Sequence, residues 1–462
     1  PADIPALCSP AGDYVVLCCD KSILSYSLLL GVMFTGATAV LCPHGKADII
    51  HEMTKGHRVK AAFFHKKYSE LVKASLKRMD TPPSLVAVID SEDPQMNAII
   101  TSEEECVTYK VHHPEEHISI ILFSSGTTGE PKGIQMSDTA ITLMGVLFAP
   151  HVKTLFNASP FYWYTGVMTF ISPILNSYTV VMSNATETIE NVKLVQKYQA
   201  DGWFLSIGAM IQCTHLENIE SYDCSSIKEV YAGGEVMLKS VMEAFLAKVV
   251  GGPAMVQVMY GITEGGIMAT TNSDDEALLE TSLQPGLFLH LSPGVEMKIL
   301  DDDRKPVAPG SLGEVWFKCP GMTPGYWSLP ELNRQVFDKD GFFCSGDAGF
   351  CNHRGYLFHR GRVSDLITYK GVKVAPAEVE EVLMSHPSVL DAVVIGKAHS
   401  TDTQHVTAFV VRRPGSRATG EEIAAFVDNQ VDDVRKLRGG VHFVESLPRI
   451  AVGKVIRKVL RT

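Results

Sequence analysis

Residues 118–136 read Ile-Ser-Ile-Ile-Leu-Phe-Ser-Ser-Gly-Thr-Thr-Gly-Glu-Pro-Lys-Gly-Ile-Gln-Met, and the rest of the chain can be interpreted around them. The apolar, β-branched run Ile118–Phe123 is typical of a buried strand. A turn rich in hydroxyls and glycine follows, and glycine lets successive backbone N–H groups converge on one anion. The stretch therefore predicts a polyphosphate cradle built from Ser124, Ser125, Gly126, Thr127, Thr128, Gly129 and the cationic Lys132.

This loop differs from the commoner P-loop. The P-loop requires Gly-Lys-Ser/Thr at the start of a helix, whereas Pro131-Lys132-Gly133 keeps the chain extended or turned. The alternative is a polar surface turn without a ligand. The order of strand, hydroxyl cluster and lysine favours the phosphate site.

Composition limits the classes of partner. The chain has 462 residues, a net charge of −11 and no basic block, which argues against nucleic acid binding. Its ten cysteines form no Cys-x-x-Cys pair, which argues against zinc binding and indicates buried thiols in a reducing compartment. The apolar stretch Ile23–Cys42 is interrupted by polar residues and glycines, so it predicts a buried helix followed by a strand rather than a membrane span.

Strand and helix patterns alternate through the first 260 residues, which predicts parallel sheets covered by helices. Two predicted strands, 227–231 and 255–259, lead into Gly233-Gly234-Glu235 and Tyr260-Gly261-Ile262-Thr263-Glu264. Ligands of open α/β sheets bind beyond the carboxyl ends of the strands. The glycines would admit a flat ring, Tyr260 would stack on it, Thr263 offers a hydroxyl, and Glu264 offers a carboxylate for Mg²⁺. The alternative for Glu264 is a helix N-terminal carboxylate.

The pattern changes after residue 285. Short strands and turns over 285–360 predict a small β subdomain, in which Asp347, after a glycine at a strand end, could accept both hydroxyls of a ribose. The alternative is a plain turn aspartate. Residues 363–462 predict a compact α+β domain, with Lys454 on a glycine-containing loop before a basic helix. The alternative for Lys454 is a solvated side chain.

Taken in order, these motifs resemble those of the adenylate-forming enzymes, which include acyl-CoA synthetases, 4-coumarate–CoA ligases, beetle luciferases and peptide-synthetase adenylation domains. The similarity covers nearly the whole chain and favours the luciferase and coumarate-ligase branch. It rests on Ser124–Gly133, Tyr260–Glu264, Ser345-Gly346-Asp347, Gly361-Arg362, Tyr369-Lys370-Gly371, Ala375–Glu380 and Gly453-Lys454. The resemblance implies an AMP-binding N-terminal domain over 1–362 and a mobile C-terminal domain over 363–462. It also implies that the family's first several dozen residues are absent here, consistent with a chain that starts at Pro1.

The resemblance also implies two half-reactions. A carboxylate attacks the α-phosphate of Mg-ATP to give acyl-AMP and pyrophosphate, and a thiol, usually coenzyme A, then displaces AMP. Carried over to this chain, Thr127, Thr128 and Lys132 hold the leaving phosphates and Glu264 binds Mg²⁺. Gly233, Gly234 and Tyr260 hold adenine, Asp347 and Arg362 hold the ribose, and Lys454 joins the carboxylate to the α-phosphate.

Three positions depart from the family pattern. Trp163 stands where many relatives carry histidine beside the acyl pocket, as in some fatty acyl-CoA synthetases, with core packing as the alternative. Ser364 occupies the hinge position, which is usually lysine or aspartate. Thr368 replaces a lysine that luciferase-like relatives use in the second half-reaction, which argues against luciferase-type oxidation.

The sequence thus predicts an ATP-dependent acid–thiol ligase for a hydrophobic carboxylic acid, with ATP, Mg²⁺ and coenzyme A as partners. The aromatic neighbourhood of Phe161–Tyr164 and Tyr231 favours a fatty or arylalkanoic acid. Two alternatives stay open: a catalytically impaired nucleotide- or acyl-binding relative, and an adenylation enzyme with a carrier-protein acceptor. Leu460-Arg461-Thr462 is not the Ser-Lys-Leu peroxisomal address, which favours the cytoplasm.

Overall fold

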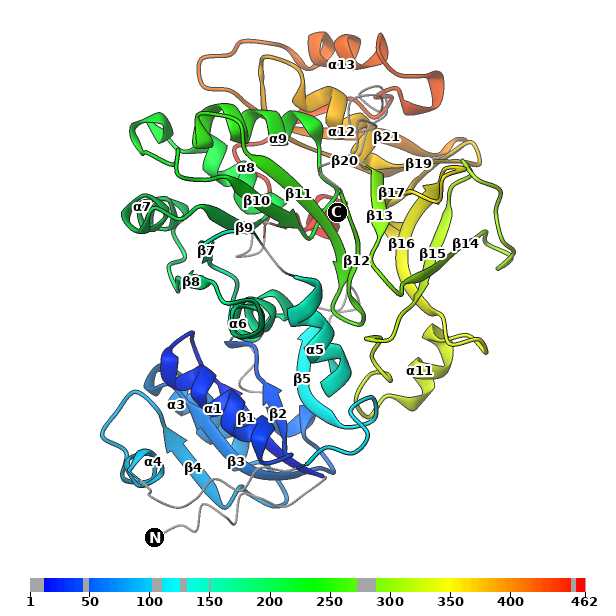
Figure 1. Ribbon diagram of the computed structural model, residues 1–462. Coiled ribbons are helices and arrows are strands. Elements are labelled where there is room, and N and C mark those ends of the chain that lie inside the picture. The colour runs from blue at the N-terminus through cyan, green and yellow to red at the C-terminus, as the bar shows by residue number, and fades with distance from the viewer. Residues whose placement is uncertain are drawn as a thin grey trace.

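The computed structural model describes residues 12–44, 50–101, 110–124, 131–148, 151–271, 288–449 and 454–461. The strands form three sheets, which follow one another from the N-terminal region at the bottom of Figure 1 to the C-terminal region at the top. This arrangement confirms the predicted α/β fold, with a large N-terminal part and a small C-terminal domain.

The first sheet has the strand order β4-β3-β1-β2-β5-β6. All neighbours are parallel except β5 and β6, which are antiparallel. None of the helices in the described ranges is long and apolar enough to cross a membrane, and the stretch after Ser22 divides into a helix and a strand as expected. The elements are β1 (Asp13–Cys18), α1 (Ile23–Phe34), β2 (Thr38–Leu41), α2 (Ile50–Met53), β3 (Arg58–Phe64), α3 (Ser69–Leu76), β4 (Leu85–Val88), α4 (Pro94–Ile100), β5 (Ile118–Ser124) and β6 (Lys132–Ser137).

The predicted phosphate loop joins β5 to β6. Ser124 at the end of β5 pairs with Lys132 at the start of β6, so the chain is extended after the loop, as the proline predicts. The loop residues Ser125, Gly126, Thr127, Thr128 and Gly129 lie outside the described residues.

Helix α5 (Asp138–Leu147) follows β6 directly. Ser137 is the N-cap, and its Oγ accepts the Ala140 N–H at 3.2 Å. The Asp138 carboxylate is engaged elsewhere, because it is bonded to His117 at 2.7 Å and to the Ser119 hydroxyl.

The second sheet has the order β14-β15-β16-β17-β13-β12-β11-β10-β9-β7-β8. The strands from β8 to β11 are parallel, and the strands from β11 to β14 are antiparallel. The short strands predicted as a β subdomain are therefore joined to the parallel strands through β13 and β12. The parallel strands alternate with helices, as predicted: β7 (Thr154–Asn157), α6 (Tyr164–Asn176), β8 (Thr179–Met182), α7 (Thr188–Tyr198), β9 (Gly202–Ser206), α8 (Ile207–His215), β10 (Glu229–Gly233), α9 (Lys239–Phe245) and β11 (Met255–Ile262).

The antiparallel part carries a short helix beside it in Figure 1. Its elements are β12 (Gly266–Thr270), β13 (Phe288–Leu291), β14 (Glu296–Leu300), β15 (Gly313–Lys318), α11 (Pro330–Val336), β16 (Phe343–Cys351) and β17 (Leu357–Arg362).

The C-terminal domain contains a third sheet of order β19-β18-β21-β20, with β22 paired to β21. It has its own apolar core, in which Ile367, Leu383, Val394 and Ile423 are fully buried. A separate core of this kind lets the domain fold as a unit. Its elements are β18 (Ile367–Tyr369), β19 (Val372–Val374), α12 (Pro376–Met384), β20 (Val389–His399), β21 (Thr403–Arg412), α13 (Gly420–Asp428), β22 (Val441–Phe443) and α14 (Arg457–Leu460).

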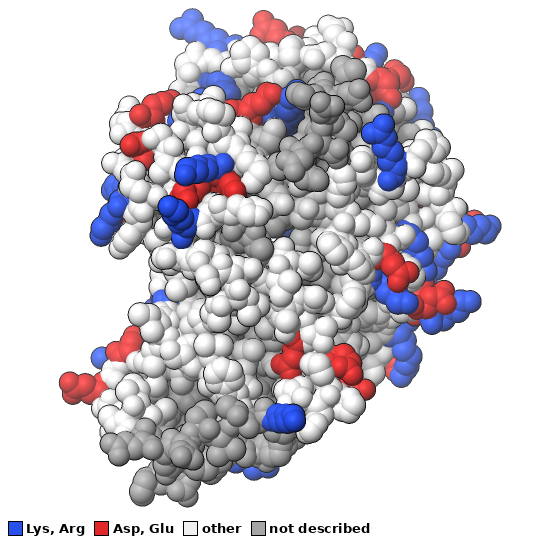
Figure 2. Space-filling model, in the orientation of Figure 1, with Lys and Arg blue, Asp and Glu red and all other residues white. Residues whose placement is uncertain are grey.

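The surface shows no segregation of charge on the face in Figure 2. Acidic and basic side chains are interspersed there and lie mainly toward the margins of the face.

Candidate active site

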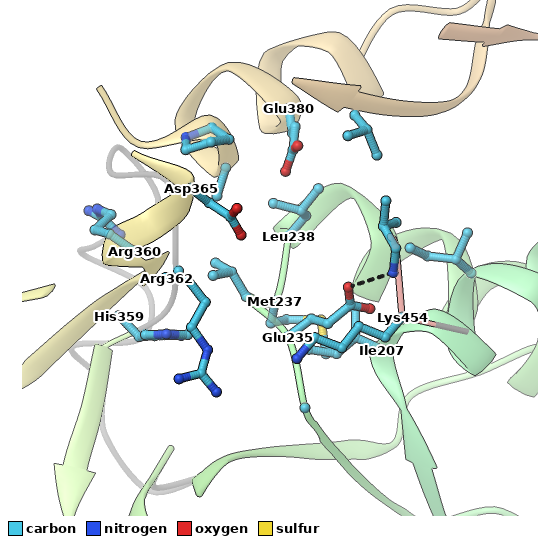
Figure 3. A pocket seen from close by; sticks show the side chains of 18 of the residues that line it. Ile207, Glu235, Met237, Leu238, His359, Arg360, Arg362, Asp365, Glu380 and Lys454 are labelled. Atoms are coloured by element: carbon cyan, nitrogen blue, oxygen red, sulfur yellow. Dashed lines mark hydrogen bonds between the residues drawn. The ribbon is translucent and has the colours of Figure 1, made fainter. Parts of the chain in front are cut away.

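A pocket lies where the second sheet meets the C-terminal domain. Its walls come from the segment after β10, from β11, β16, β17, β20, α8 and α12, and from the C-terminal tail, and Figure 3 shows charged side chains of both parts gathered around it. The predicted site residues that line it are Gly234, Glu235, Tyr260, Gly261, Asp347, Arg362 and Lys454.

Asp347 is held by several partners in this pocket. It is buried, its Oδ2 accepts the Tyr260 hydroxyl at 2.6 Å, and its Oδ1 lies 3.1 Å from Arg362 Nε. Burial raises the pKa of Asp347, but His359, Arg362 and Tyr260 together outweigh burial and hold the pKa below its ordinary value. The carboxylate is therefore charged at neutral pH.

The sequence predicted Asp347 at a strand end or in a turn, and both predictions of its place are wrong. It lies within β16, opposite Arg362 of β17, next to an irregularity between Ala348 and Gly349. The positive φ of Gly346 (69°) bends the strand just before it, which turns Asp347 toward Tyr260. The alternative of a plain turn aspartate is wrong.

Gly233 and Gly234 have different reasons to be glycine. A Cβ on Gly233, the last residue of β10, would lie 2.5 Å from the Met259 carbonyl of the next strand. Gly234 has φ +97°, and a Cβ there would meet no heavy atom within 4 Å. Gly233 thus permits close strand packing, whereas Gly234 leaves open space beside the pocket.

Lys454 and Glu235 face each other across the two parts of the chain. The Val455 N–H donates to Glu235 Oε1 at 3.4 Å, the bond that is dashed in Figure 3. Lys454 lines the pocket but remains exposed to solvent, and partial loss of water in the pocket together with Arg362 lowers its pKa. Glu235 has a raised pKa because desolvation outweighs the nearby cations Arg449 and Lys454.

Lys132 and Glu264 meet at one tyrosine outside this pocket. The Tyr326 hydroxyl donates to Glu264 Oε1 at 2.7 Å, and Lys132 Nζ lies 5.2 Å from the centre of the Tyr326 ring. Thr263 and Glu264 lie in the turn between the antiparallel strands β11 and β12. The alternative of a helix N-terminal carboxylate for Glu264 is therefore wrong.

The aromatic residues expected near the acyl group do not line this pocket. Trp163 is half-buried and precedes α6, whereas Phe161 and Tyr231 are buried in the core. Tyr231 packs edge-on against Phe148, with the ring centres 5.1 Å apart. Much of the apolar wall comes instead from residues that the sequence did not single out, among them Ile207, Ile211, Met237 and Leu238.

Two further groups escaped the sequence analysis. His359 packs against the Tyr260 ring with centres 4.8 Å apart, and only its place two residues before Gly361 hinted at the site. Arg457 binds Glu380 of α12 at 2.6 Å and holds the tail that carries Lys454. No local motif signals this pair, because its partners come from distant segments.

Comparison with known families matches two models. The model described as AMP-binding enzyme matches residues 10–327, and the model described as AMP-binding enzyme C-terminal domain matches residues 378–454. The two matches include Glu235, Tyr260 and Lys454, whereas Asp347 and Arg362 lie between them and Arg457 lies after the second.

Individual relatives are enzymes of several activities. The chain is 31% identical to luciferin 4-monooxygenase of Nipponoluciola cruciata over 75% of its own length and 64% of that enzyme's length. It is 29% identical to a probable CoA ligase of Humulus lupulus over 97% of its own length and 83% of the relative's. It is 29% identical to the peroxisomal OPC-8:0-CoA ligase 1 of Arabidopsis thaliana over 97% and 83% of the two lengths.

Solved structures share the fold. ATP-bound MatB from Rhodopseudomonas palustris superposes with a TM-score of 0.86 at 22% identity, over 99% of this chain and 89% of that one. The anthranilate CoA ligase AuaEII in complex with anthranoyl-AMP also gives 0.86 at 22% identity, over 98% and 87%. At this identity the likeness establishes the fold alone.

Proposed function

The chain belongs to the AMP-binding enzyme family, and on this premise we propose that it is an ATP-dependent acid–thiol ligase. It activates a hydrophobic carboxylic acid as acyl-AMP and transfers the acyl group to coenzyme A. In this proposal, residues 1–362 bind the nucleotide and residues 363–462 form the domain that brings Lys454 to it.

The pocket residues fit an adenosine nucleotide. Gly234 leaves open space where a flat base can approach, and Tyr260 lines the same pocket. Asp347 is charged and already accepts a hydrogen bond from the Tyr260 hydroxyl. A charged carboxylate forms strong hydrogen bonds with hydroxyl groups, so it also suits the two hydroxyls of a ribose. Arg362 would hold the same sugar from the other side.

The phosphates would extend toward the loop between β5 and β6. There Lys132 supplies positive charge, and the loop hydroxyls of Thr127 and Thr128 supply donors in this proposal. Glu264 would hold Mg²⁺, which neutralises the charge of the leaving phosphates. The contact of both Lys132 and Glu264 with Tyr326 supports a shared phosphate and metal region.

The Lys454 ammonium would stabilise the negative charge in the transition state of the first half-reaction. The acid oxygen forms a bond to the α-phosphorus while the bond to pyrophosphate breaks, so two anions must approach each other. A cation aimed at the forming bond stabilises the transition state more than the separated reactants. The position of Lys454 in the same pocket as Asp347, Tyr260 and Arg362 is the observation that carries the proposal.

The apolar wall supports a hydrophobic acid. Ile207, Ile211, Met237 and Leu238 would bury the acyl or aryl group beside the nucleotide. Burial of such groups from water contributes about 25 cal/mol per Å² of apolar surface.

The test is a panel of carboxylic acids with Mg-ATP and coenzyme A. We expect release of both pyrophosphate and AMP with hydrophobic acids, together with an acyl-CoA product. ATP binding without release for any acid would favour the catalytically impaired alternative. Acyl-AMP formation without a coenzyme A product would favour a carrier-protein acceptor.

The first prediction concerns Lys454→Ala. We expect it to reduce acid-dependent pyrophosphate release by two orders of magnitude or more, about 3 kcal/mol of barrier, while ATP still binds. Stopped-flow pyrophosphate detection and an ATP titration measure the two effects. Lys458→Ala, on the exposed face of α14, is the matched control and should be unchanged. An unchanged rate in Lys454→Ala would remove Lys454 from this role.

A further inference from the structure

A second cluster of ligand-type side chains lies in the turn between β20 and β21. His399 ends β20, Asp402 lies in the turn, and His405 is the third residue of β21. None of the three lines the pocket described above. Each offers one ligand atom, and the three atoms all lie within 4.8 Å of one another.

The spacing of these atoms is close to that of a metal coordination shell. Asp402 Oδ2 lies 2.9 Å from His405 Nε2 and 3.7 Å from His399 Nδ1. A tetrahedral zinc ion with bonds of about 2.0–2.1 Å requires neighbouring ligand atoms about 3.3 Å apart. The two distances bracket this value, and an ion shared by both histidines requires their stacked rings to rotate until the lone pairs, which lie in the ring planes, converge.

The two imidazole rings lie against each other beside the carboxylate. They stack with centres 3.7 Å apart and an interplanar angle of 15°, and each presents a nitrogen to the same carboxylate oxygen. His399 Nδ1 accepts the backbone N–H of Asp402 at 3.3 Å. Because a backbone N–H can only donate, Nδ1 is the unprotonated nitrogen of His399, and a metal bound there would take the place of this hydrogen bond.

The backbone of the turn is fixed by the neighbouring hairpin. The Asp402 carbonyl accepts the N–H groups of Lys370 at 3.1 Å and of Gln404 at 2.9 Å. Lys370 Nζ lies 3.7 Å from Asp402 Oδ1, the carboxylate oxygen that does not face the histidines. These contacts orient the carboxylate from the side away from the histidines, as hydrogen-bond partners of metal ligands commonly do.

We propose that His399, Asp402 and His405 form a binding site for a divalent transition metal of the zinc class. Two imidazoles and one carboxylate suit zinc, whereas Mg²⁺ and Ca²⁺ prefer oxygen ligands. The exposed edge of His399 leaves a fourth position for water. The cysteine spacing, which argued against zinc, concerns thiolate ligands only and does not address this site.

The test is titration of the purified chain with Zn²⁺ by calorimetry, without ATP and with excess Mg²⁺. We expect one tight equivalent per chain. His399→Asn, Asp402→Asn and His405→Asn should each weaken it about ten-fold or more. His353→Asn, in the exposed turn before β17, is the matched control and should bind as the wild type does.

Two further measurements separate this site from other metal ligands. Co²⁺ bound at the site should give visible d–d absorption without thiolate-to-cobalt charge transfer, since no cysteine belongs to the cluster. Zn²⁺ should also raise the melting temperature of the wild type and of His353→Asn, but not of the three ligand variants. Absence of a tight equivalent, thiolate charge transfer, or equal affinity in the ligand variants would overturn the proposal.

Discussion

Asp347 is a buried charge held by several partners. Its carboxylate binds a phenol and a guanidinium while buried, and its pKa is lowered in the folded chain. A lowered folded pKa means that this stabilisation is fully present above the unfolded value of about 3.9 and is lost as pH falls through the folded value. The network is therefore intact throughout the neutral range in which a nucleotide would bind.

Lys454 leads to a prediction about pH. Loss of water and the nearby Arg362 lower its pKa, despite the opposing charges of Glu235, Asp347 and Asp365. We expect the protonated form of Lys454 to act. Because its pKa is lowered, this form is lost at a lower pH than in a free lysine, whose pKa is about 10.4. We expect kcat/KM for the acid to fall on the alkaline side below that value.

Lys454→Arg provides the control for this assignment. The arginine guanidinium stays charged up to about pH 12. In Lys454→Arg the alkaline fall in kcat/KM should therefore move to higher pH, although the overall rate drops. An identical alkaline fall in wild type and Lys454→Arg would assign the titration to another group.

Single residues were predictable where a motif carried them. Tyr260, Asp347, Arg362 and Lys454 came from recognisable local patterns, and all four line one pocket. Trp163 does not line this pocket. The sequence alone could not exclude this, because an aromatic residue at the start of a helix is equally compatible with packing in the core. Tyr326 had no local signal, since its contacts with Glu264 and Lys132 arise only from folding.

At the scale of elements, the helix α12 fixes the C-terminal domain against the large part. Glu381 of α12 accepts the backbone N–H groups of Lys239 and Ser240, at 2.9 and 3.0 Å, at the start of α9. These N–H groups have no partner within their own helix, and a carboxylate near a helix N-terminus is stabilising. In Figure 1, α9 and α12 lie side by side at this junction.

Glu381→Ala should therefore loosen the junction. Losing a cap costs about 1 kcal/mol, which corresponds to about five-fold faster hydrogen exchange at the amides of Lys239 and Ser240. Exchange followed by mass spectrometry or NMR measures this effect. Glu421→Ala, in the exposed first turn of α13, should leave both amides unchanged. Equal protection in Glu381→Ala and wild type would mean that the cap contributes little in solution.

Most elements were predictable from periodicity, and their ends were less so. The strand expected at 255–259 continues to Ile262, because pairing with β12 extends it through Tyr260. Likewise β16 runs past Asp347 to Cys351, because β17 pairs with it along that length. Both extensions depend on a partner strand that lies elsewhere in the sequence.

At the scale of the whole molecule, the sheets and the C-terminal domain create a site that neither has alone. Tyr260, Asp347 and Arg362 belong to the second sheet, and Lys454 belongs to the tail that Arg457 holds against α12. Sequence order predicted the two parts, but not the joining of the antiparallel strands to the parallel ones through β13. Long-range pairing of this kind leaves no local pattern to recognise.

The most direct test of the central claim is a crystal structure of the chain with ATP and Mg²⁺. We predict ribose hydroxyls on Asp347, the base beside Gly234 and Tyr260, phosphates toward Lys132 and the 125–130 loop, and Lys454 within reach of the α-phosphate. A nucleotide bound away from Asp347 and Lys132, or a Lys454 ammonium that cannot reach the α-phosphate, would contradict the account.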